Sequence, residues 1–295
     1  MGEDDDRSGN LAAALAKFRE AHRATEALLR KDPENPDRIF AHAQSEYWVG
    51  QAAWRIRDRA TTERHWQGYV TEARKLLDRD MDKARANLEM GYALGNLCDL
   101  YLHDNHDVAK AIDYCQRSIS FERAALHFAP DRTEISIALA NRYGWLADAL
   151  LAQKSFEAAR EARLSEQAII DGLVEKDPRN FELRFRQSWP LLGMATIAIE
   201  QGKPRQAAQE SQKVIEAIRL LVAEEPRNTE VKRALARGHY SRAKALANYD
   251  SATARIELGE TRRLIAEMER GSESSQAFAS FWEAIGELEA KLDGK

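Results

Sequence analysis

The chain has 295 residues, of which 44% are hydrophobic and 31% charged, and its formal net charge is −4. Only 7 residues are Pro and 15 are Gly, so the composition is typical of a helix-rich soluble protein. The chain lacks the excess of positive charge that nucleic-acid binders carry, and its longest uncharged run, residues 187–199, is too short to span a bilayer. We therefore expect no nucleic-acid partner and no membrane insertion.

The chain begins with an acidic segment, residues 1–8, which we predict to be disordered. Residues 9–32 follow with the stretch "GNLAAALAKFREAHRATEALL", which has the apolar periodicity of one amphipathic helix. No partner helix is predicted before it, and a single helix of a repeated pair cannot bury its apolar face alone. We expect either that the chain was cut from a longer protein or that this helix caps an array.

Proline residues mark a repeat in the next part of the chain. Pro130, Pro178 and Pro226 are 48 residues apart (178 − 130 and 226 − 178), and Pro33 lies about two such units earlier, with Met81 at the position of the missing proline. Proline ends a helix because it lacks an N–H group and restricts the residue before it. The predicted repeat units lie near residues 9–32, 33–80, 81–129, 130–177, 178–225 and 226–270.

Two columns of small residues recur at fixed distances from these marks. Ten residues after the marks stand Ala43, Gly91, Ala140, Ser188 and Ala236. Seventeen residues after them stand Gly50, Cys98, Ala147, Ala195 and Ala243. The columns are about two helical turns apart, so they share one helix face and let two helix backbones approach closely. Each unit is therefore predicted to be an antiparallel pair of helices.

Three further signals refine this pattern. Asn180 and Asn228 are predicted to cap the first helix of their units. Pro190 lies inside such a helix and is expected to kink it, because proline cannot donate a hydrogen bond to the carbonyl of Arg186. Residues 271–295 are predicted to form a C-terminal capping helix, at 274–292, and a tail.

The repeated pairs resemble tetratricopeptide repeats, in an elongated variant with a 48-residue period. The stretches that carry the resemblance are 9–21, 94–119 and 191–215, each with small residues at fixed places around a turn. The resemblance implies an all-α fold: a right-handed superhelical solenoid of antiparallel pairs, with about eleven repeat helices and the capping helix. It is also similar to the long-helix repeats found beside kinase, protease or signalling domains in large bacterial proteins.

The chain has two cysteines, Cys98 and Cys115. We interpret them as two small buried thiols, because two cysteines do not make a disulfide framework. The alternative is a single disulfide between neighbouring helices, since both residues fall within one predicted pair.

The resemblance implies that the first helix of each pair lines a concave inner surface. On the face of these helices opposite the apolar stripe, polar residues alternate with aromatic ones, a combination that suits the capture of a peptide. The alternative is that the aromatic rings fill gaps between neighbouring helices. The predicted partner-binding residues are Gln44, Trp48, Tyr92, Asn96, Asp99, Asn141, Trp145, Asp148, Trp189, Arg237 and Lys244.

The sequence contains no phosphate-binding loop, nucleophile elbow or metalloprotease motif, so we expect no catalytic residues, no cofactor and no enzymatic activity. The stretch "YLHDNHD" holds His103 and His106, which are candidates for a divalent metal. Because Asp, Asn and His are also ordinary turn residues, we interpret this stretch as a turn between paired helices and expect no metal.

These observations predict a non-catalytic protein-interaction or sensing module that binds a peptide or protein segment on its concave face. We expect it to be the regulatory part of a larger bacterial protein, with an effector domain upstream. The alternatives are a self-associating assembly scaffold, which forms homo-oligomers, and a receptor for a small signal molecule or peptide. We expect a cytoplasmic location, or a periplasmic or extracytoplasmic one if the chain is a fragment of a membrane protein.

Overall fold

The computed structural model describes residues 11–79, 82–103, 107–270 and 278–294. Within these ranges the regular structure is entirely α-helical, as predicted. The chain divides into two compact units, Met1–Gln153 and Lys154–Lys295. Among the residues described, no helix is long and apolar enough to cross a membrane.

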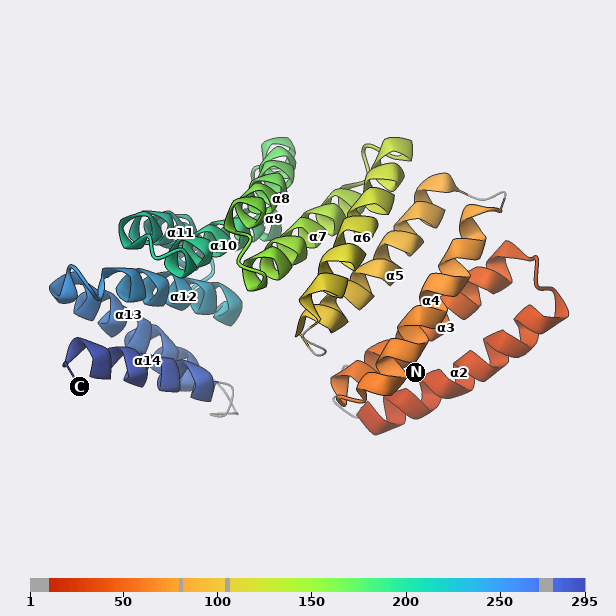
Figure 1. The fold of residues 1–295 in the computed structure, drawn as a ribbon, viewed down its shortest axis with the longest axis horizontal. Helices are drawn as coiled ribbons and strands as arrows, with labels where there is room; N and C mark the ends of the chain where they lie inside the picture. The colour runs from red at the N-terminus through yellow and green to blue at the C-terminus, as the bar shows by residue number, and fades with distance from the viewer. Residues whose placement is uncertain (1–10, 80–81, 104–106, 271–277, 295) are drawn as a thin grey trace. The chain divides into compact units, whose positions relative to one another are not determined.

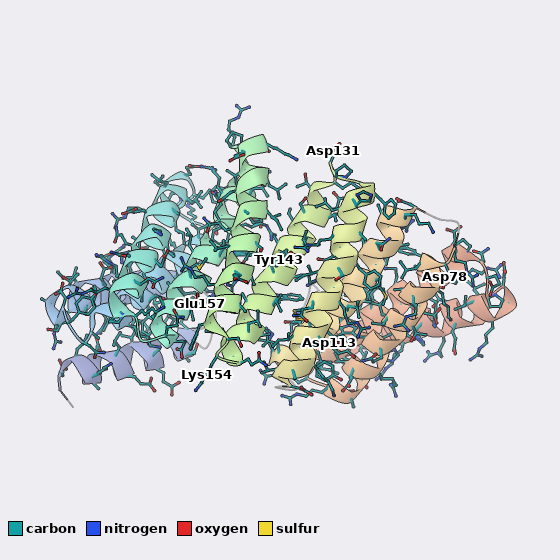
Figure 2. The ribbon with its side chains drawn as sticks, turned by 45° about the horizontal axis from the view of Figure 1, so that its top comes forward. Asp78, Asp113, Asp131, Tyr143, Lys154 and Glu157 are labelled. Atoms are coloured by element: carbon teal, nitrogen blue, oxygen red, sulfur yellow. A yellow bond between two sulfur atoms is a disulfide. The ribbon has the colours of Figure 1, made fainter. Side chains whose placement is uncertain are left out.

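The first unit is a row of helices in which each packs against the next in the chain (Figure 1). Its helices are α2 (Leu11–Lys31), α3 (Pro36–Arg55), α4 (Arg59–Leu77), α5 (Lys83–His103), α6 (Val108–Phe128) and α7 (Thr133–Ala152). The helices pack as antiparallel pairs, α3 with α4 and α5 with α6. Tyr143 of α7, labelled in Figure 2, accepts a hydrogen bond from Arg123 of α6 and so links one hairpin to the next helix.

The second unit is built in the same way. Its helices are α8 (Phe156–Lys176), α9 (Phe181–Arg186), α10 (Ser188–Glu200), α11 (Pro204–Glu224), α12 (Thr229–Leu246), α13 (Ser251–Arg270) and α14 (Ala279–Leu292). The short α9 and α10 together occupy the place of one first helix. Counted in this way, the residues described form eleven repeat helices and one terminal helix, as the sequence predicted.

The helix starts and interruptions follow from single residues. The side chains of Asn180 and Asn228 accept hydrogen bonds from backbone N–H groups in the first turns of α9 and α12, which confirms both predicted caps. Asn35 caps α3 in the same manner. The predicted kink is a break at Gln187, between α9 and α10, where Pro190 cannot donate to the carbonyl of Arg186.

The terminal helix α14 covers the last hairpin. Ile285 and Leu288 of α14 are buried in the apolar core that α12 and α13 contribute to. Tyr240 of α12 donates a hydrogen bond to the backbone carbonyl of Ala284, 3.3 Å away. The helix thus shields apolar side chains that the last pair would otherwise expose, which is the role predicted for it.

Cys98 of α5 and Cys115 of α6 form a disulfide, with 5.2 Å between their Cα atoms. The preferred sequence interpretation, two buried thiols, was therefore wrong, and the alternative holds. Both residues are fully buried, and the bond joins the two helices of one hairpin. The sequence could not decide between the interpretations, because either requires small residues at a close helix crossing.

All members of the two small-residue columns are buried. The approach is close at Gly50 of α3, where an added Cβ atom would overlap the indole ring of Trp66 on α4. Trp66 is 1% exposed, so its ring has no free space to move into. The small residues therefore set the distance between the paired helices, as the spacing predicted.

We expect Gly50→Ala to lower the free energy of unfolding by about 1–3 kcal/mol, because the extra methyl group forces Trp66 out of a well-packed position. Gly259→Ala is the matched control, since a Cβ atom added at Gly259 of α13 would meet no described atom within 4 Å. The control should be neutral or stabilising by up to ~1 kcal/mol, because alanine has the higher helix propensity. Urea denaturation of both variants checks this, and equal effects would contradict it.

Candidate functional site

The first unit contains a cavity of about 320 Å³ with a mixed polar and aromatic lining. It is lined by Gln44, Tyr47, Tyr69, Glu89, Tyr92, Asn96 and Arg142. These side chains come from α3, α4, α5 and α7, so three successive first helices and one second helix contribute. Three of the eleven residues predicted to bind a partner, Gln44, Tyr92 and Asn96, lie together in this lining.

A buried carboxylate organises one side of the cavity. Oε2 of Glu89 accepts hydrogen bonds from the hydroxyl of Tyr69, at 2.5 Å, and from Nε2 of Gln44, at 2.7 Å. Burial raises the pKa of Glu89 above its ordinary value, although both hydrogen bonds oppose the shift. The bonds fix Gln44 and Tyr69 against α5, which gives this side of the cavity a defined arrangement of polar groups.

A buried ion pair organises the other side. Nε of Arg142 lies 3.1 Å from Oε1 of Glu122, and both side chains are almost completely buried. The Arg142 guanidinium also lies 4.2 Å from the centre of the Trp145 ring, in a cation–π contact. It packs against Gly95 so closely that no Cβ atom would fit there. Glycine at position 95 thus allows Arg142 to lie across α5.

The lining also contains an unsatisfied polar atom. Nδ2 of Asn96 is buried and has no hydrogen-bond partner among the residues described. A buried amide without a partner is costly, and such groups are uncommon in folded proteins. Next to it in the lining stands Tyr92, one helical turn earlier on α5 and half-buried. The Asn96 amide, a hydrogen-bond donor, and the Tyr92 ring therefore suit a ligand that has both a carbonyl group and an apolar surface.

The other predicted residues of the first unit lie outside this lining. Trp48 stacks on Phe18 of α2, with ring centres 5.3 Å apart, and so fills space between helices. Trp145 is half-buried beneath the Arg142 guanidinium. Asp99, Asn141 and Asp148 are half-buried on α5 and α7.

In the second unit, three predicted residues are exposed: Trp189 on α10, and Arg237 and Lys244 on α12. Trp189 is 36% exposed and is covered on one side by the Arg186 guanidinium, 4.6 Å from the ring centre. None of the three lines the cavities around Leu235, around Tyr249 or around Asn228 in this unit.

His103, a metal candidate in the sequence, lies in an ordinary ion pair at the end of α5. Nδ1 of His103 lies 2.8 Å from Oδ1 of Asp99, one turn earlier on α5. This hydrogen bond raises the pKa of His103 above its usual value. His106 lies outside the described residues. Among the residues described, no third metal-ligand side chain joins His103 and Asp99.

Four lining residues were not among those predicted from the sequence: Tyr47, Tyr69, Glu89 and Arg142. A signal for two of them was present. Glu89 and Arg142 are charged residues inside otherwise apolar helical stretches, "ANLEMGYALG" and "LANRYGWLA". A charge at such a place is buried on folding and needs a partner, which marks a polar site within the core.

No protein-family model matches the chain, and no curated protein matches its sequence. Solved structures do match. BtubC from P. vanneervenii is 15% identical with a TM-score of 0.62, over 90% of this chain and 94% of that one. The nuclear import adaptor Nro1 of S. pombe is 15% identical with a TM-score of 0.58, over 96% and 95%. The apo form of RapI is 12% identical with a TM-score of 0.54, over 84% of each chain.

These likenesses extend over most of each chain and concern the fold. Together with the antiparallel helix pairs, they define the chain as a helical-repeat protein with a tetratricopeptide-like fold, which is the resemblance that the sequence indicated. At this level of identity the likeness concerns the arrangement of helices and leaves the residues of the cavity to be interpreted from their own chemistry.

Proposed function

We propose that this protein is a non-catalytic interaction module and that the cavity lined by Tyr92 and Asn96 binds an extended segment of a peptide or protein. The observation that carries the proposal is the buried Asn96 amide without a partner, next to the Tyr92 ring in the cavity lining. A peptide carbonyl would accept a hydrogen bond from Asn96, and an apolar side chain of the peptide would cover Tyr92.

The charges of the lining support a peptide rather than a strongly charged ligand. Arg142 is already paired with Glu122, and Glu89 accepts hydrogen bonds from Tyr69 and Gln44. Both charged side chains of the lining are therefore already engaged by other residues of the protein. The cavity volume of about 320 Å³ is at the small end of ligand pockets, which suits one or two peptide side chains.

The fold and one structural neighbour agree with this role. Helical-repeat arrays offer surfaces that contact partners along several repeats, and Nro1, which has a similar fold, is described as a nuclear import adaptor. We further propose that the module regulates a larger bacterial protein of which it is a part. The sequence motifs required for phosphate transfer or nucleophilic catalysis are absent, which favours binding over catalysis.

The Cys98–Cys115 disulfide bears on the compartment. Disulfides persist in oxidising compartments and are rare in the bacterial cytoplasm, so the bond favours a periplasmic or extracytoplasmic location over the cytoplasmic one. Protein purified from its native cells without reductant and then unfolded should show no thiol that reacts with a maleimide. Two reactive thiols would contradict both the disulfide and this location.

The test of the binding function is a selection from a random-peptide display library on the full chain. We expect selected peptides to bind the native protein and to lose at least tenfold in affinity for Asn96→Ala and Tyr92→Ala, measured by fluorescence anisotropy. Arg179→Ala is the control, because Arg179 is an exposed residue of the second unit that was not predicted to bind a partner. Circular dichroism must show unchanged helicity in each variant.

Two results would overturn the proposal. The first is that no peptide is enriched on the native chain. The second is that enriched peptides bind the Asn96 and Tyr92 variants as tightly as the native protein. An assembly scaffold would give a different set of results. The native protein would sediment as a multiple of the monomer mass and bind no peptide, and Asn96→Ala would sediment as a monomer.

A further inference from the structure

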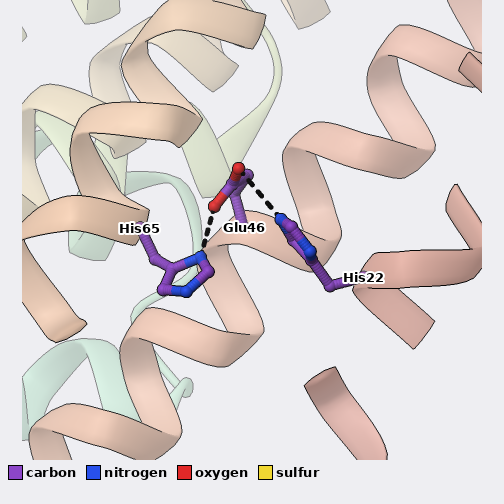
Figure 3. Close-up of side chains that lie close together, drawn as sticks. All are labelled: His22, Glu46 and His65. Atoms are coloured by element: carbon purple, nitrogen blue, oxygen red, sulfur yellow. Dashed lines mark hydrogen bonds and ion pairs between the residues drawn. The ribbon is translucent and has the colours of Figure 1, made fainter. Parts of the chain in front are cut away.

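Two histidines and a glutamate from three successive helices meet near the start of the first unit. His22 lies on α2, Glu46 on α3 and His65 on α4, and Figure 3 shows the two imidazole rings on either side of the carboxylate. Nε2 of His22 is 3.0 Å from Oε1 of Glu46, and Nδ1 of His65 is 2.5 Å from Oε2. The ligand-type atoms of all three side chains lie within 4.8 Å of one another.

We propose that His22, Glu46 and His65 bind a divalent transition-metal ion of the zinc type. Two imidazoles and one carboxylate form a donor set that zinc accepts, with a fourth position left for water or another ligand. In a tetrahedral site with bonds of about 2.0–2.2 Å, neighbouring ligand atoms are roughly 3.3 Å apart. The 3.0 Å between His22 and Glu46 is close to that value, whereas the 2.5 Å between His65 and Glu46 is a hydrogen-bond distance, so this pair would have to separate as a metal ion replaces the shared proton.

The contact between His22 and Glu46 places two metal-binding side chains together in the protein interior. Nε2 of His22 is buried and lies 3.0 Å from Oε1 of Glu46, as an ion pair when the imidazole is protonated. A metal ion would take the place of the proton between the two atoms.

Gly68 of α4 provides a second and independent indication. A Cβ atom added at Gly68 would lie 2.6 Å from Cδ of Glu46, and within 2.8 Å of both carboxylate oxygens. The carboxylate therefore occupies space that exists because position 68 is glycine. Gly68 is three residues after His65, so both lie on the same face of α4. Helix α4 thus contributes His65 as a ligand and, through Gly68, leaves space for the Glu46 carboxylate.

A third histidine lies next to the cluster. His42 is 6% exposed, and its Nε2 lies 3.7 Å from Oε1 of Glu46. Its Nδ1 lies 3.1 Å from the hydroxyl of Thr25, which in turn donates to the backbone carbonyl of His22. This arrangement orients His42 and the backbone of His22 together, as outer residues of metal sites commonly do. We therefore assign His42 as a positioning residue and not as a ligand.

The ion would attach α2 to the hairpin that follows it. Two apolar clusters already join these parts, one around Phe18 and Val49 and the other around Leu29 and Leu76. A metal that binds only when the three helices are in place stabilises the folded arrangement by mass action. The proposed ion is thus a clamp on the first helix of the unit, and it is independent of peptide binding at the cavity.

The test uses the full chain, freed of metal with a chelator and titrated with zinc chloride alone. We expect one zinc ion per chain by calorimetry, a rise in melting temperature, and cobalt(II) absorption bands typical of a tetrahedral site. Magnesium should have no effect, since it prefers oxygen ligands in an octahedral arrangement. His65→Gln should weaken zinc binding at least tenfold. His103→Gln is the matched control, because His103 also pairs with a carboxylate in a helix of this unit.

Gly68→Ala provides a further variant that removes no ligand and should also weaken zinc binding. If His65→Gln fails to fold, His22→Gln and the cobalt spectrum of the native chain decide the matter. The proposal is overturned if the native chain takes up no zinc at micromolar concentration. It is equally overturned if folded His65→Gln or His22→Gln binds zinc as tightly as His103→Gln, in which case the three residues form a metal-free ion pair.

Discussion

Replacement of Arg142 by methionine is expected to lower the free energy of unfolding by about 3–5 kcal/mol at a pH above 7. The reason is the carboxylate that remains. Glu122 is fully buried, and Arg142 is the cation that contacts it, 3.1 Å from Nε to Oε1. Its second oxygen, Oε2, has no hydrogen-bond partner among the residues described. Urea denaturation followed by circular dichroism measures the loss.

Two further variants make this prediction specific. Arg117→Met removes an exposed pair with Asp113, one turn apart on α6, and should cost less than ~1 kcal/mol. The double variant Glu122→Gln, Arg142→Met should recover most of the loss, because it removes the unpaired charge as well as its partner. A loss in Arg142→Met no larger than that in Arg117→Met would contradict the importance of the buried pair.

The stability of the protein is expected to depend on pH through the same carboxyl group. Burial raises the pKa of Glu122 from 4.5 to about 7, although Arg142 opposes the shift. Between these values the unfolded chain releases the proton while the folded protein keeps it. The folded state then binds more protons, so this group's contribution to the free energy of unfolding falls as the pH rises from about 4.5 to about 7.

The expected size of this contribution is about 3 kcal/mol, from the shift in pKa and ~1.4 kcal/mol per unit. Other groups also titrate in this range, so the informative quantity is the difference between the native chain and Glu122→Gln. That difference should change across the range and become constant above it. Parallel stability curves for the two proteins would contradict a raised pKa at Glu122.

The repeat architecture could be predicted because it depends on local signals that recur. Pro178 and Pro226 mark the ends of helices, Asn180 and Asn228 cap the next ones, and Pro190 interrupts a helix at the expected place. Each of these effects acts within a few residues of its cause. The pattern occurs in five copies along the chain. Their alignment shows which small residues recur at the contact between paired helices, and these are the residues that the structure buries.

The candidate site could be predicted only in part, because its chemistry depends on contacts between helices distant in sequence. The polar face predicted for α5 includes Tyr92 and Asn96, and both line the cavity. The same reasoning also selected Trp48, which instead packs on Phe18 of α2, the helix that has no predicted partner. His22, Glu46 and His65 are each ordinary on their own helices. Only the packing of α2, α3 and α4 brings them together.

The central claim is that the cavity, whose lining includes residues of the first helices α3, α5 and α7 and Tyr69 of α4, receives a peptide segment. Hydrogen exchange of the full chain, with and without a peptide selected on it, tests this claim most directly. We predict slower exchange in α3, α5 and α7 when the peptide is bound, and none of this protection in Asn96→Ala at the same peptide concentration. Protection confined to helices that do not line the cavity, or retained in Asn96→Ala, would contradict the account.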